Sequence, residues 1–331
     1  MDWFGNITGF KELDYAATQA LLRVEEGRLV SLHSTRRWGV GEFETPTLAE
    51  LRQRVLGGQR GSEPTHFRSL VADAGSLHGD AANRSALFQV ASQFNALEMT
   101  GPSIAPEDGV TRYADDPTQG PACAIAAGAA TIYRNYLVPH EGKIGQTRER
   151  QVDCLRDVGQ ALGNEDGSLW CMQNGYALCT DQGLQRIDSI LELLTDSARE
   201  ALKGLMRVGL HWNVEVTAAD RGHLVSQVFC SALPVRYSHV PKDRWKNFAQ
   251  LILEAAYEAT LLAAILNRRQ TGNPVVYLTR LGGGAFGNDG VWIHAAIERA
   301  LFRFADSGLD IRLVSYGAVL PEYVQLEKSY P

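Results

Sequence analysis

Two neighbouring aspartates and a run of glycines are the residues of this chain best suited to chemistry. Asp115 and Asp116 stand in a polar loop just before a small-residue segment that favours a helix. One interpretation is that this loop presents both carboxylates, and the first backbone N–H groups of the helix at Gln119 and Gly120, to a ligand. The alternative is ordinary local structure, in which the aspartates form a turn and cap the helix.

The second group is a glycine-rich turn in the stretch VVYLTRLGGGAFGNDGVWI, residues 275–293. Gly282, Gly283 and Gly284 have no Cβ, so their backbone N–H groups can approach a phosphate closely. The N-terminus of the helix that follows adds the positive end of its dipole. The turn lacks the lysine of a GxxxxGK(S/T) loop and does not fit the GxGxxG dinucleotide pattern. A plain flexible turn is therefore the alternative.

Local sequence patterns place this turn in a strand–loop–helix–strand unit. Val275–Thr279 is a β-branched and aromatic run typical of a buried strand. Apolar residues recur at helical intervals from Val291, and Ile311–Tyr316 is strand-like again. Ligands of open α/β sheets bind at the carboxyl ends of strands, where the turn lies. The sequence thus predicts one crevice shared by the glycine turn and the aspartate-bearing loop.

The rest of the chain alternates helical and strand-like segments, which favours one α/β domain with insertions. Further helices are expected at Lys11–Glu26, Pro46–Leu56, Pro121–Leu137, Arg148–Leu162, Ile187–Arg207 and Trp245–Arg269, and further strands at Leu29–Ser34, Thr65–Val71, Leu87–Ser92, Leu210–Thr217 and Leu224–Leu233. Asn174-Gly175 is a two-residue hairpin signal. That hairpin sets Cys171 opposite Leu178, so Cys171 and Cys179 do not face each other.

Composition narrows the class of protein. The 331 residues carry a net charge of −6 without a basic stripe, which argues against a nucleic-acid partner. We expect that no apolar run reaches the length of a membrane span, and the N-terminus lacks a secretory pattern, so we expect a cytoplasmic protein without a membrane partner. The five cysteines show no metal-ligand spacing. We expect reduced thiols, no metal and no cofactor.

Three strings carry a family resemblance. LGGGAFGND resembles the second ligand loop of macrodomains, which wraps the diphosphate of ADP-ribose. FQVASQFNALE and DDPTQGPACA resemble the asparagine-bearing strand end and the first ligand loop. Together the strings resemble the arginine-specific macrodomain (ADP-ribosyl)hydrolases. The triple glycine of ordinary macrodomain first loops is replaced here by Thr118-Gln119-Gly120-Pro121, and the glycine-rich signature with paired glutamates of poly(ADP-ribose) glycohydrolases is absent.

The resemblance implies a fold and a domain organisation. The expected fold is a three-layer α/β/α macrodomain-like sandwich with a mixed, mostly parallel central sheet and added N-terminal and internal elements. Residues 1–64 are assigned to an N-terminal extension packed on the core. Residues 65–331 are assigned to a macrodomain-like catalytic domain with an insertion around 140–210.

The resemblance also implies a substrate, ADP-ribose linked to an arginine side chain of a protein, and hydrolysis of the N-glycosidic bond. Breaking that bond builds positive charge on the ribose, which a carboxylate stabilises, and a carboxylate can also activate water. A carboxylate pair would bind the guanidinium. We assign Asp115, Asp116 and Asp289 to these tasks without distinguishing their roles. Glu98 is a further acidic candidate.

Substrate contacts are assigned to both loops and to the end of the strand before them. The assigned residues are Gln93, Asn95, Thr118, Gln119, Gly120, Gly282, Gly283, Gly284, Ala285, Phe286, Gly287 and Asn288. Phe286 is expected to pack on the ribose or base, and Asn95 to bond a ribose hydroxyl; the alternatives are a core phenylalanine and a turn-closing asparagine. Two other functions stay open: a reader that binds ADP-ribose without turnover, and a hydrolase of a free ADP-ribose derivative or another nucleotide sugar.

Overall fold

A seven-stranded mixed sheet forms the centre of the fold. The computed structural model describes residues 1–58, 63–218 and 222–330. In spatial order the strands are β4 (Glu42–Glu44), β11 (Gly209–Glu215), β12 (Leu224–Cys230), β6 (Leu87–Ala91), β13 (Val275–Thr279), β14 (Asp310–Ser315) and β5 (His66–Val71). The strands from β12 to β5 are parallel, whereas β11 and β4 extend the sheet in antiparallel pairs. The carboxyl ends of five strands therefore meet at one edge.

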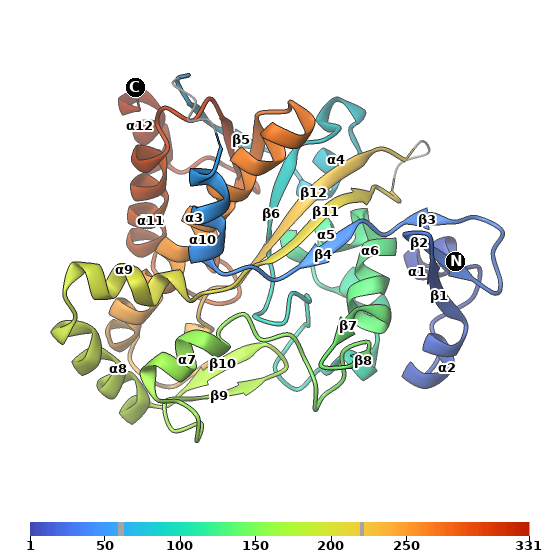
Figure 1. Ribbon diagram of the computed structural model, residues 1–331, viewed down its shortest axis with the longest axis horizontal. Helices are drawn as coiled ribbons and strands as arrows, with labels where there is room; N and C mark the ends of the chain where they lie inside the picture. The colour runs from blue at the N-terminus through green and yellow to red at the C-terminus, as the bar shows by residue number, and fades with distance from the viewer. Residues whose placement is uncertain (59–62, 219–221, 331) are drawn as a thin grey trace.

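Helices cover both faces of the sheet (Figure 1). One layer contains α3 (Leu48–Leu56), α10 (Lys246–Thr271), α11 (Gly290–Arg303) and α12 (Pro321–Ser329). The other contains α4 (Ala74–Gly79), α5 (Gln119–Ala126) and α6 (Gly128–Ile132). This arrangement confirms the expected three-layer α/β/α sandwich with a mixed, mostly parallel sheet.

Smaller elements surround these layers. The N-terminal segment holds α1 (Trp3–Thr8), α2 (Tyr15–Ala20), β1 (Leu22–Glu25), β2 (Arg28–Ser31) and β3 (Trp38–Gly39). The region after α6 holds a π-helical turn (Tyr133–Leu137), β7 (Pro139–His140), β8 (Lys143–Ile144), α7 (Arg156–Leu162), β9 (Trp170–Gln173), β10 (Tyr176–Cys179), α8 (Asp181–Leu193) and α9 (Asp196–Gly204). Short 3-10 turns occur at Ala81–Asn83, Pro106–Asp108, Thr111–Asp115, Val235–Tyr237 and Lys242–Trp245.

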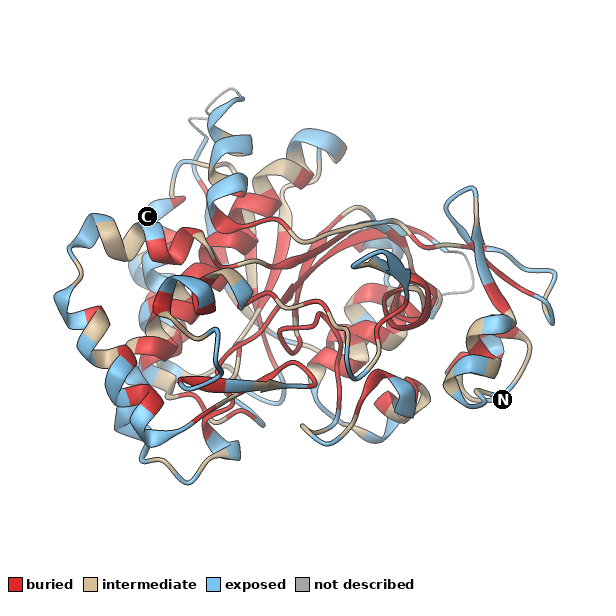
Figure 2. Ribbon diagram, turned by 60° about the horizontal axis from the view of Figure 1, so that its bottom comes forward, coloured by how far each residue is buried: buried red, intermediate tan, exposed pale blue. Residues whose placement is uncertain are grey.

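The longest helix lies against the sheet rather than on the surface. The segment Lys242–Thr271 is long and apolar enough to cross a membrane by composition, so the expectation that no run reaches that length is wrong. Within its most apolar window, however, 78% is buried inside the fold. Figure 2 shows the same concentration of buried residues in this helix and the central strands. Its apolar character is therefore explained by core packing.

The central strand β6 shows why the sheet edge is firmly fixed. Its apolar residues are buried without alternation, as expected of a parallel strand covered on both faces. The one polar side chain in it, Gln89, is also buried. Its amide nitrogen donates to the Thr260 hydroxyl at 2.9 Å, and its oxygen accepts the N–H of Thr279 at 3.2 Å. Gln89 thus ties β6 both to α10 and to the last residue of β13, immediately before the glycine turn.

Several expected helices are shorter or divided. Only Tyr15–Ala20 of the segment Lys11–Glu26 is helical, because β1 pairs with β2 across a turn with left-handed Glu26 and Gly27. The segment expected at Arg148–Leu162 is helical only from Arg156. The helix expected near Ile187–Arg207 is two helices, because the Thr195 hydroxyl accepts the Ala198 N–H and starts α9.

The single helix expected at Pro121–Leu137 is also interrupted. Its axis breaks at Ala127, which has φ −112° and ψ 53°. At the break, the N–H of Gly128 donates to the Thr217 hydroxyl at 2.8 Å instead of continuing the helix. A Cβ on Gly128 would lie 2.4 Å from the end of the Ile7 side chain, so a larger residue here would displace Ile7 of the N-terminal segment.

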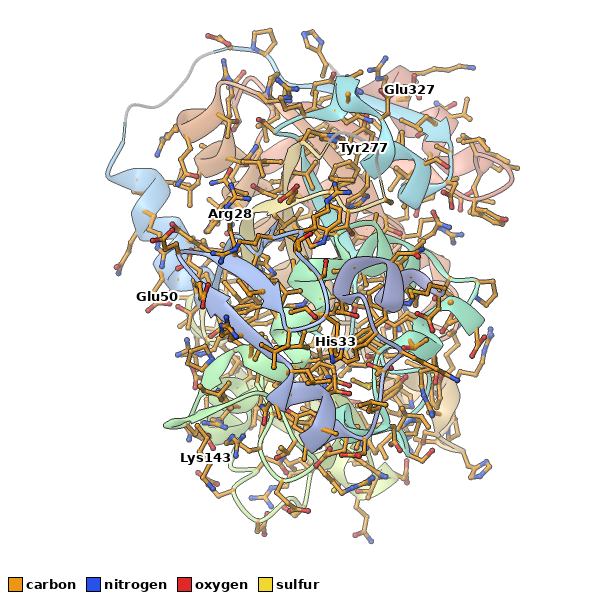
Figure 3. The ribbon with its side chains drawn as sticks, turned by 90° about the vertical axis from the view of Figure 1, so that its right-hand side faces the viewer. Arg28, His33, Glu50, Lys143, Tyr277 and Glu327 are labelled. Atoms are coloured by element: carbon orange, nitrogen blue, oxygen red, sulfur yellow. The ribbon has the colours of Figure 1, made fainter. Side chains whose placement is uncertain are left out.

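The expected hairpin at Asn174-Gly175 is confirmed as β9–β10, with Cys171 opposite Leu178. All five cysteines are free. The hairpin contacts the core, since the Phe94 N–H donates to the Gly175 carbonyl at 2.9 Å. The N-terminal segment contributes β4 to the edge of the sheet beside β11 (Figure 1), and Figure 3 views the side of the molecule on which Arg28 and His33 of this segment lie.

We predict that Gln89→Met lowers the free energy of unfolding by about 1–3 kcal/mol, because it leaves the part-buried Thr279 N–H without its acceptor and the buried Thr260 hydroxyl without its donor. Urea denaturation of the purified protein measures the change. Gln185→Met, which loses only an exposed hydrogen bond to Asp181, is the control and should stay within about 0.5 kcal/mol of the wild type. Equal effects of the two substitutions would show that Gln89 does not tie the strands together.

Candidate functional site

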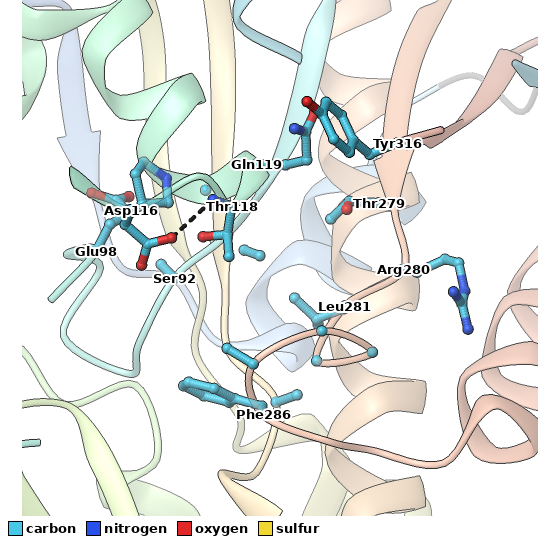
Figure 4. A pocket seen from close by; sticks show the side chains of 18 of the residues that line it. Ser92, Glu98, Asp116, Thr118, Gln119, Thr279, Arg280, Leu281, Phe286 and Tyr316 are labelled. Carbon is cyan, nitrogen blue, oxygen red and sulfur yellow. Dashed lines mark hydrogen bonds between the residues drawn. The ribbon is translucent and has the colours of Figure 1, made fainter. Parts of the chain in front are cut away.

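A cavity of about 520 Å³ opens at the carboxyl edge of the parallel strands. It is lined by the residues that follow β6, β12, β13 and β14 and by the N-terminus of α5 (Figure 4). The sequence-predicted residues among its lining are Gln93, Asp116, Thr118, Gln119, Gly120 and Gly282–Phe286. The aspartate-bearing loop and the glycine turn therefore do share one crevice, as the order of the strands requires.

The glycine turn is held in shape by its ends. Gly282 has a left-handed φ of 73°, and a Cβ there would lie 2.4 Å from that of Ala232, so only glycine fits. The N–H of Asn288 donates to the Gly282 carbonyl at 2.9 Å, and the Asn288 side chain donates to the Leu233 carbonyl at 2.7 Å. Asn288 thus closes the turn from behind and is not among the cavity-lining residues. Gly287, also left-handed, lies outside the lining as well.

The middle of the turn has unused donors. Within the described parts of the chain, the N–H groups of Gly284, Ala285 and Phe286 donate no hydrogen bond. No atom outside the turn lies within 4 Å of the position of a Gly284 Cβ, so this stretch of backbone is open. Consecutive free N–H groups in a glycine turn form a concave site for an anion.

The N-terminus of α5 approaches the same cavity. Gly120 packs so tightly on β6 that a Cβ would lie 2.1 Å from the Ala91 carbonyl oxygen. Thr118 occupies the N-cap position but its side chain caps no N–H group. The Gln119 side chain instead accepts the N–H of Ala74 at 2.8 Å and so links α5 to α4. The first N–H groups of α5 are left for a ligand.

Glu98 is the cavity-lining residue with the most unusual environment. Its side chain is 2% exposed, and neither carboxyl oxygen has a hydrogen-bond partner among the described residues. The nearest cation is the buried Arg134, whose Nη2 lies 3.6 Å from Oε2. Burial raises the pKa of Glu98 to about 8, with Arg134 acting in the opposite direction. This shift favours the neutral, protonated form of Glu98 at pH 7.

A tight turn after β6 brings Glu98 back to the strand edge. The turn needs a left-handed residue, Ala96 with φ 57°, and two side chains hold it. The Asn95 oxygen accepts the Leu97 N–H at 3.0 Å, and the Gln93 oxygen accepts the Met99 N–H at 2.6 Å. Asn95 is fully buried, and the structure does not bring it to the cavity wall, because its amide nitrogen is directed to Gln151 at 2.8 Å.

The structure brings only one of the three assigned aspartates to the cavity. Asp116 lines it beside Glu98 (Figure 4), and its carboxylate accepts the N–H of Thr118 at 2.8 Å. Asp115 is exposed and outside the lining. Asp289 caps α11 by accepting the Val291 N–H at 2.9 Å, and its other oxygen lies 2.7 Å from the Lys242 ammonium. These two hydrogen bonds, with Lys242 first, lower the pKa of Asp289.

An aromatic group closes the side of the cavity next to the glycine turn. The ring centroid of Phe286 lies 5.2 Å from that of Tyr176 and 5.8 Å from that of Tyr237. Tyr176 belongs to the β9–β10 hairpin, and its hydroxyl donates to the Met99 carbonyl at 2.7 Å. The internal insertion therefore contributes part of the cavity wall, which the sequence did not indicate.

Metal and thiol chemistry find no support here. Over the ranges 1–58, 63–218 and 222–330, no group of three His, Cys, Asp or Glu side chains could hold a metal ion. Cys123 lies in α5, but burial raises the pKa of its thiol well above the ordinary value. Cys123 is accordingly a packing residue.

Comparisons with known proteins give remote structural matches. No family model matches the chain, and no curated protein matches it. The poly(ADP-ribose) glycohydrolase of Thermomonospora curvata aligns with 13% identity and a TM-score of 0.46, covering 95% of this chain and 96% of that chain. The same enzyme bound to the inhibitor ADP-HPD aligns with 13% identity and a TM-score of 0.44, covering 95% and 97%. The Deinococcus radiodurans glycohydrolase in complex with ADP-ribose aligns with 11% identity and a TM-score of 0.44, covering 85% and 90%.

These matches correct the expected subclass. The sequence strings indicated the arginine-specific macrodomain hydrolases, whereas the solved structures that match are poly(ADP-ribose) glycohydrolases, a different subclass, so that recognition is wrong. At these identities and TM-scores the likeness assigns no activity to this chain. Because the paired-glutamate signature is absent as well, the roles of its residues rest on its own geometry.

We predict that the stability of Glu98→Gln, relative to the wild type, rises from pH 5 to pH 9. Between the ordinary pKa of 4.5 and the raised pKa of about 8, the folded protein keeps a proton on Glu98 that the unfolded chain has lost. The wild type is therefore fully stabilised by this group below pH 4.5 and loses up to about 1.4 kcal/mol per pH unit as the pH rises through this window. Urea denaturation at pH 5, 7 and 9 measures the difference.

The exposed substitution Glu192→Gln is the control with the same change of charge. A stability difference between Glu98→Gln and the wild type that does not vary with pH would mean that Glu98 is ionised in the folded protein.

Proposed function

We propose that the protein is a hydrolase that binds ADP-ribose in this cavity and cleaves the glycosidic bond joining it to a second group. The observation that carries the proposal is Glu98, a buried carboxyl group without hydrogen-bond partners, on the wall of a cavity that also exposes free backbone N–H groups. A neutral acid and an anion cradle in one cavity are the groups that cleavage of a diphosphate-bearing glycoside needs.

The proposed binding mode uses the main chain. The diphosphate lies on the N–H groups of Gly284, Ala285 and Phe286, with the N-terminus of α5 adding its dipole. The ribose attached to the second group lies between Phe286 and the acidic wall. This orientation places the sugar near Glu98 and Asp116, which are side by side in the cavity (Figure 4).

The proposed reaction uses Glu98 as the acid and Asp116 as the carboxylate that stabilises charge and activates water. Glu98 donates its proton to the leaving group as the bond to the ribose carbon breaks. The carboxylate of Asp116 stabilises the positive charge that develops on the ribose and accepts a proton from the water that attacks the same carbon. The products are free ADP-ribose and the protonated leaving group. Asp115 and Asp289 remain predicted catalytic residues, and their positions lead us to expect smaller effects.

An arginine side chain of a protein is the specific second group that we propose. Asp116 can accept hydrogen bonds from a guanidinium, whose planar donors suit a carboxylate. A guanidinium already carries the proton with which it leaves, whereas a hydroxyl leaving group must receive one from Glu98. Linkage to arginine and linkage to a hydroxyl group therefore differ in how strongly cleavage depends on Glu98.

We predict that Asp116→Asn lowers turnover of every linkage by about 10²–10⁴-fold, the usual range for loss of general acid–base catalysis, and that Glu98→Gln does so for hydroxyl-linked substrates and has a smaller effect on arginine-linked ones. Release of ADP-ribose is measured with arginine-, serine- and glutamate-linked peptides and with ADP-ribose polymer, together with ADP-ribose affinity by titration. For hydroxyl-linked substrates, wild-type turnover should fall as the pH rises through the raised pKa of Glu98, about 8, because the acid loses its proton.

Asp115→Asn and Asp289→Asn complete the series as matched changes of charge. If the wild type binds ADP-ribose tightly but turns over no substrate, the protein is a reader of ADP-ribose and the hydrolase proposal is wrong. Wild-type turnover in Glu98→Gln and Asp116→Asn would remove the proposed acid and carboxylate.

We predict that Gly282→Ala weakens ADP-ribose binding by about tenfold or more. The added Cβ forces the turn away from Ala232, so its N–H groups no longer point toward one anion. Isothermal titration measures the affinity. Gly272→Ala is the control, since Gly272 has the same left-handed backbone with nothing within 4 Å of its Cβ position and caps α10. The control should lose some stability but keep its affinity.

A further inference from the structure

The acidic wall of the cavity depends on a loop with little regular structure. Between the turn that carries Glu98 and the start of α5, the chain forms only two 3-10 turns, Pro106–Asp108 and Thr111–Asp115. Asp116 follows the second turn directly. A loop of this kind keeps a carboxylate in place only when other parts of the fold hold its backbone.

Glu12, in the N-terminal segment, holds this loop at the start of the second 3-10 turn. Its Oε1 accepts the N–H of Val110 at 2.9 Å and the Tyr136 hydroxyl at 2.8 Å. Its Oε2 accepts the N–H of Thr111 at 2.8 Å. Gly109, with φ 82°, lets the loop close over the carboxylate, because a Cβ there would lie 2.5 Å from Oε2.

The same 3-10 turn connects directly to both carboxyl groups of the cavity. Tyr113, fully buried in this turn, accepts the N–H of Glu98 through its hydroxyl at 3.2 Å. Its carbonyl accepts the N–H of Asp116 at 3.3 Å. One residue of the turn therefore contacts the backbone of both acids, and Glu12 fixes the beginning of that turn two residues earlier.

We propose that Glu12 is a positioning residue for Glu98 and Asp116, acting through Val110, Thr111 and Tyr113. The inference rests on the proposed function, and it makes the N-terminal segment part of the catalytic apparatus although it contributes no residue to the cavity lining within the described chain. A carboxylate suits the place because three donors converge on it, whereas a glutamine would turn its own N–H₂ group toward one of them.

The test compares Glu12→Gln with Asp14→Asn. Asp14 lies in the same segment, is exposed, and only caps α2, a task that asparagine performs as well. We expect Glu12→Gln to lower kcat by about 10–100-fold, as small displacements of catalytic groups do, with ADP-ribose affinity within about threefold of the wild type. Affinity is kept because the glycine turn is held by other residues. Asp14→Asn should change neither quantity.

Hydrogen exchange gives a second readout that does not need activity. In Glu12→Gln, the amides of Val110, Thr111 and Glu98 should exchange faster, while those of Gly283 and Asn288 should not change. Tyr113→Phe, which keeps the ring and removes the hydroxyl, should lower kcat in the same way, and the double variant should lose less than the product of the two single losses.

The outcomes separate this inference from the proposed function. If the wild type turns over no ADP-ribose substrate, the proposed function fails. Unchanged hydrogen exchange at Val110 and Thr111 in Glu12→Gln would separately show that Glu12 does not hold this loop. If the wild type is active, equal losses of kcat and affinity, or wild-type kcat in both Glu12→Gln and Tyr113→Phe, would overturn the positioning role.

Discussion

A carboxyl group buried without hydrogen bonds is the constraint on which this site depends. Such a group is costly to bury in its charged form, so the fold keeps Glu98 protonated, as its raised pKa indicates. The partial attraction of Arg134 at 3.6 Å limits that cost without supplying a close ion pair. An apolar residue at this position would avoid the cost of burial, which marks Glu98 as a candidate functional residue.

The same cavity also exposes backbone N–H groups, which carry partial positive charge and suit an anion. On one side the glycine turn presents partial positive charge from backbone N–H groups, and the N-terminus of α5 adds its own beside the acids. On the other side Glu98 and Asp116 present acidic groups. Because both loops follow parallel strands, the topology of the sheet alone places them at one edge. A ligand with a diphosphate next to a sugar would match both sides at once.

The sequence was most informative where local pattern and topology decide the structure. Val275–Thr279 was predicted to the residue, because a β-branched run followed by glycines admits little else. The shared crevice followed from the rule for parallel strands. Local pattern was less informative for side-chain roles: Asn95 and Asp289 have the residue types of ligand contacts but serve a turn and a helix cap. Glu98 is marked by burial without a hydrogen-bond partner, and both features depend on residues far away in the chain.

The two sides of the cavity are supported by different parts of the chain. The glycine turn is held by residues of the central sheet and its edge, such as Ala232 and Leu233. The turn that carries Glu98 is held mainly by additions to the sheet.

These additions are the internal insertion and the N-terminal segment. From the insertion, Gln151 bonds Asn95, and Gly175 accepts the Phe94 N–H. The N-terminal segment acts through Glu12 on the loop that supports Glu98. Changes in these additions would therefore alter the position of Glu98 while leaving the glycine turn intact.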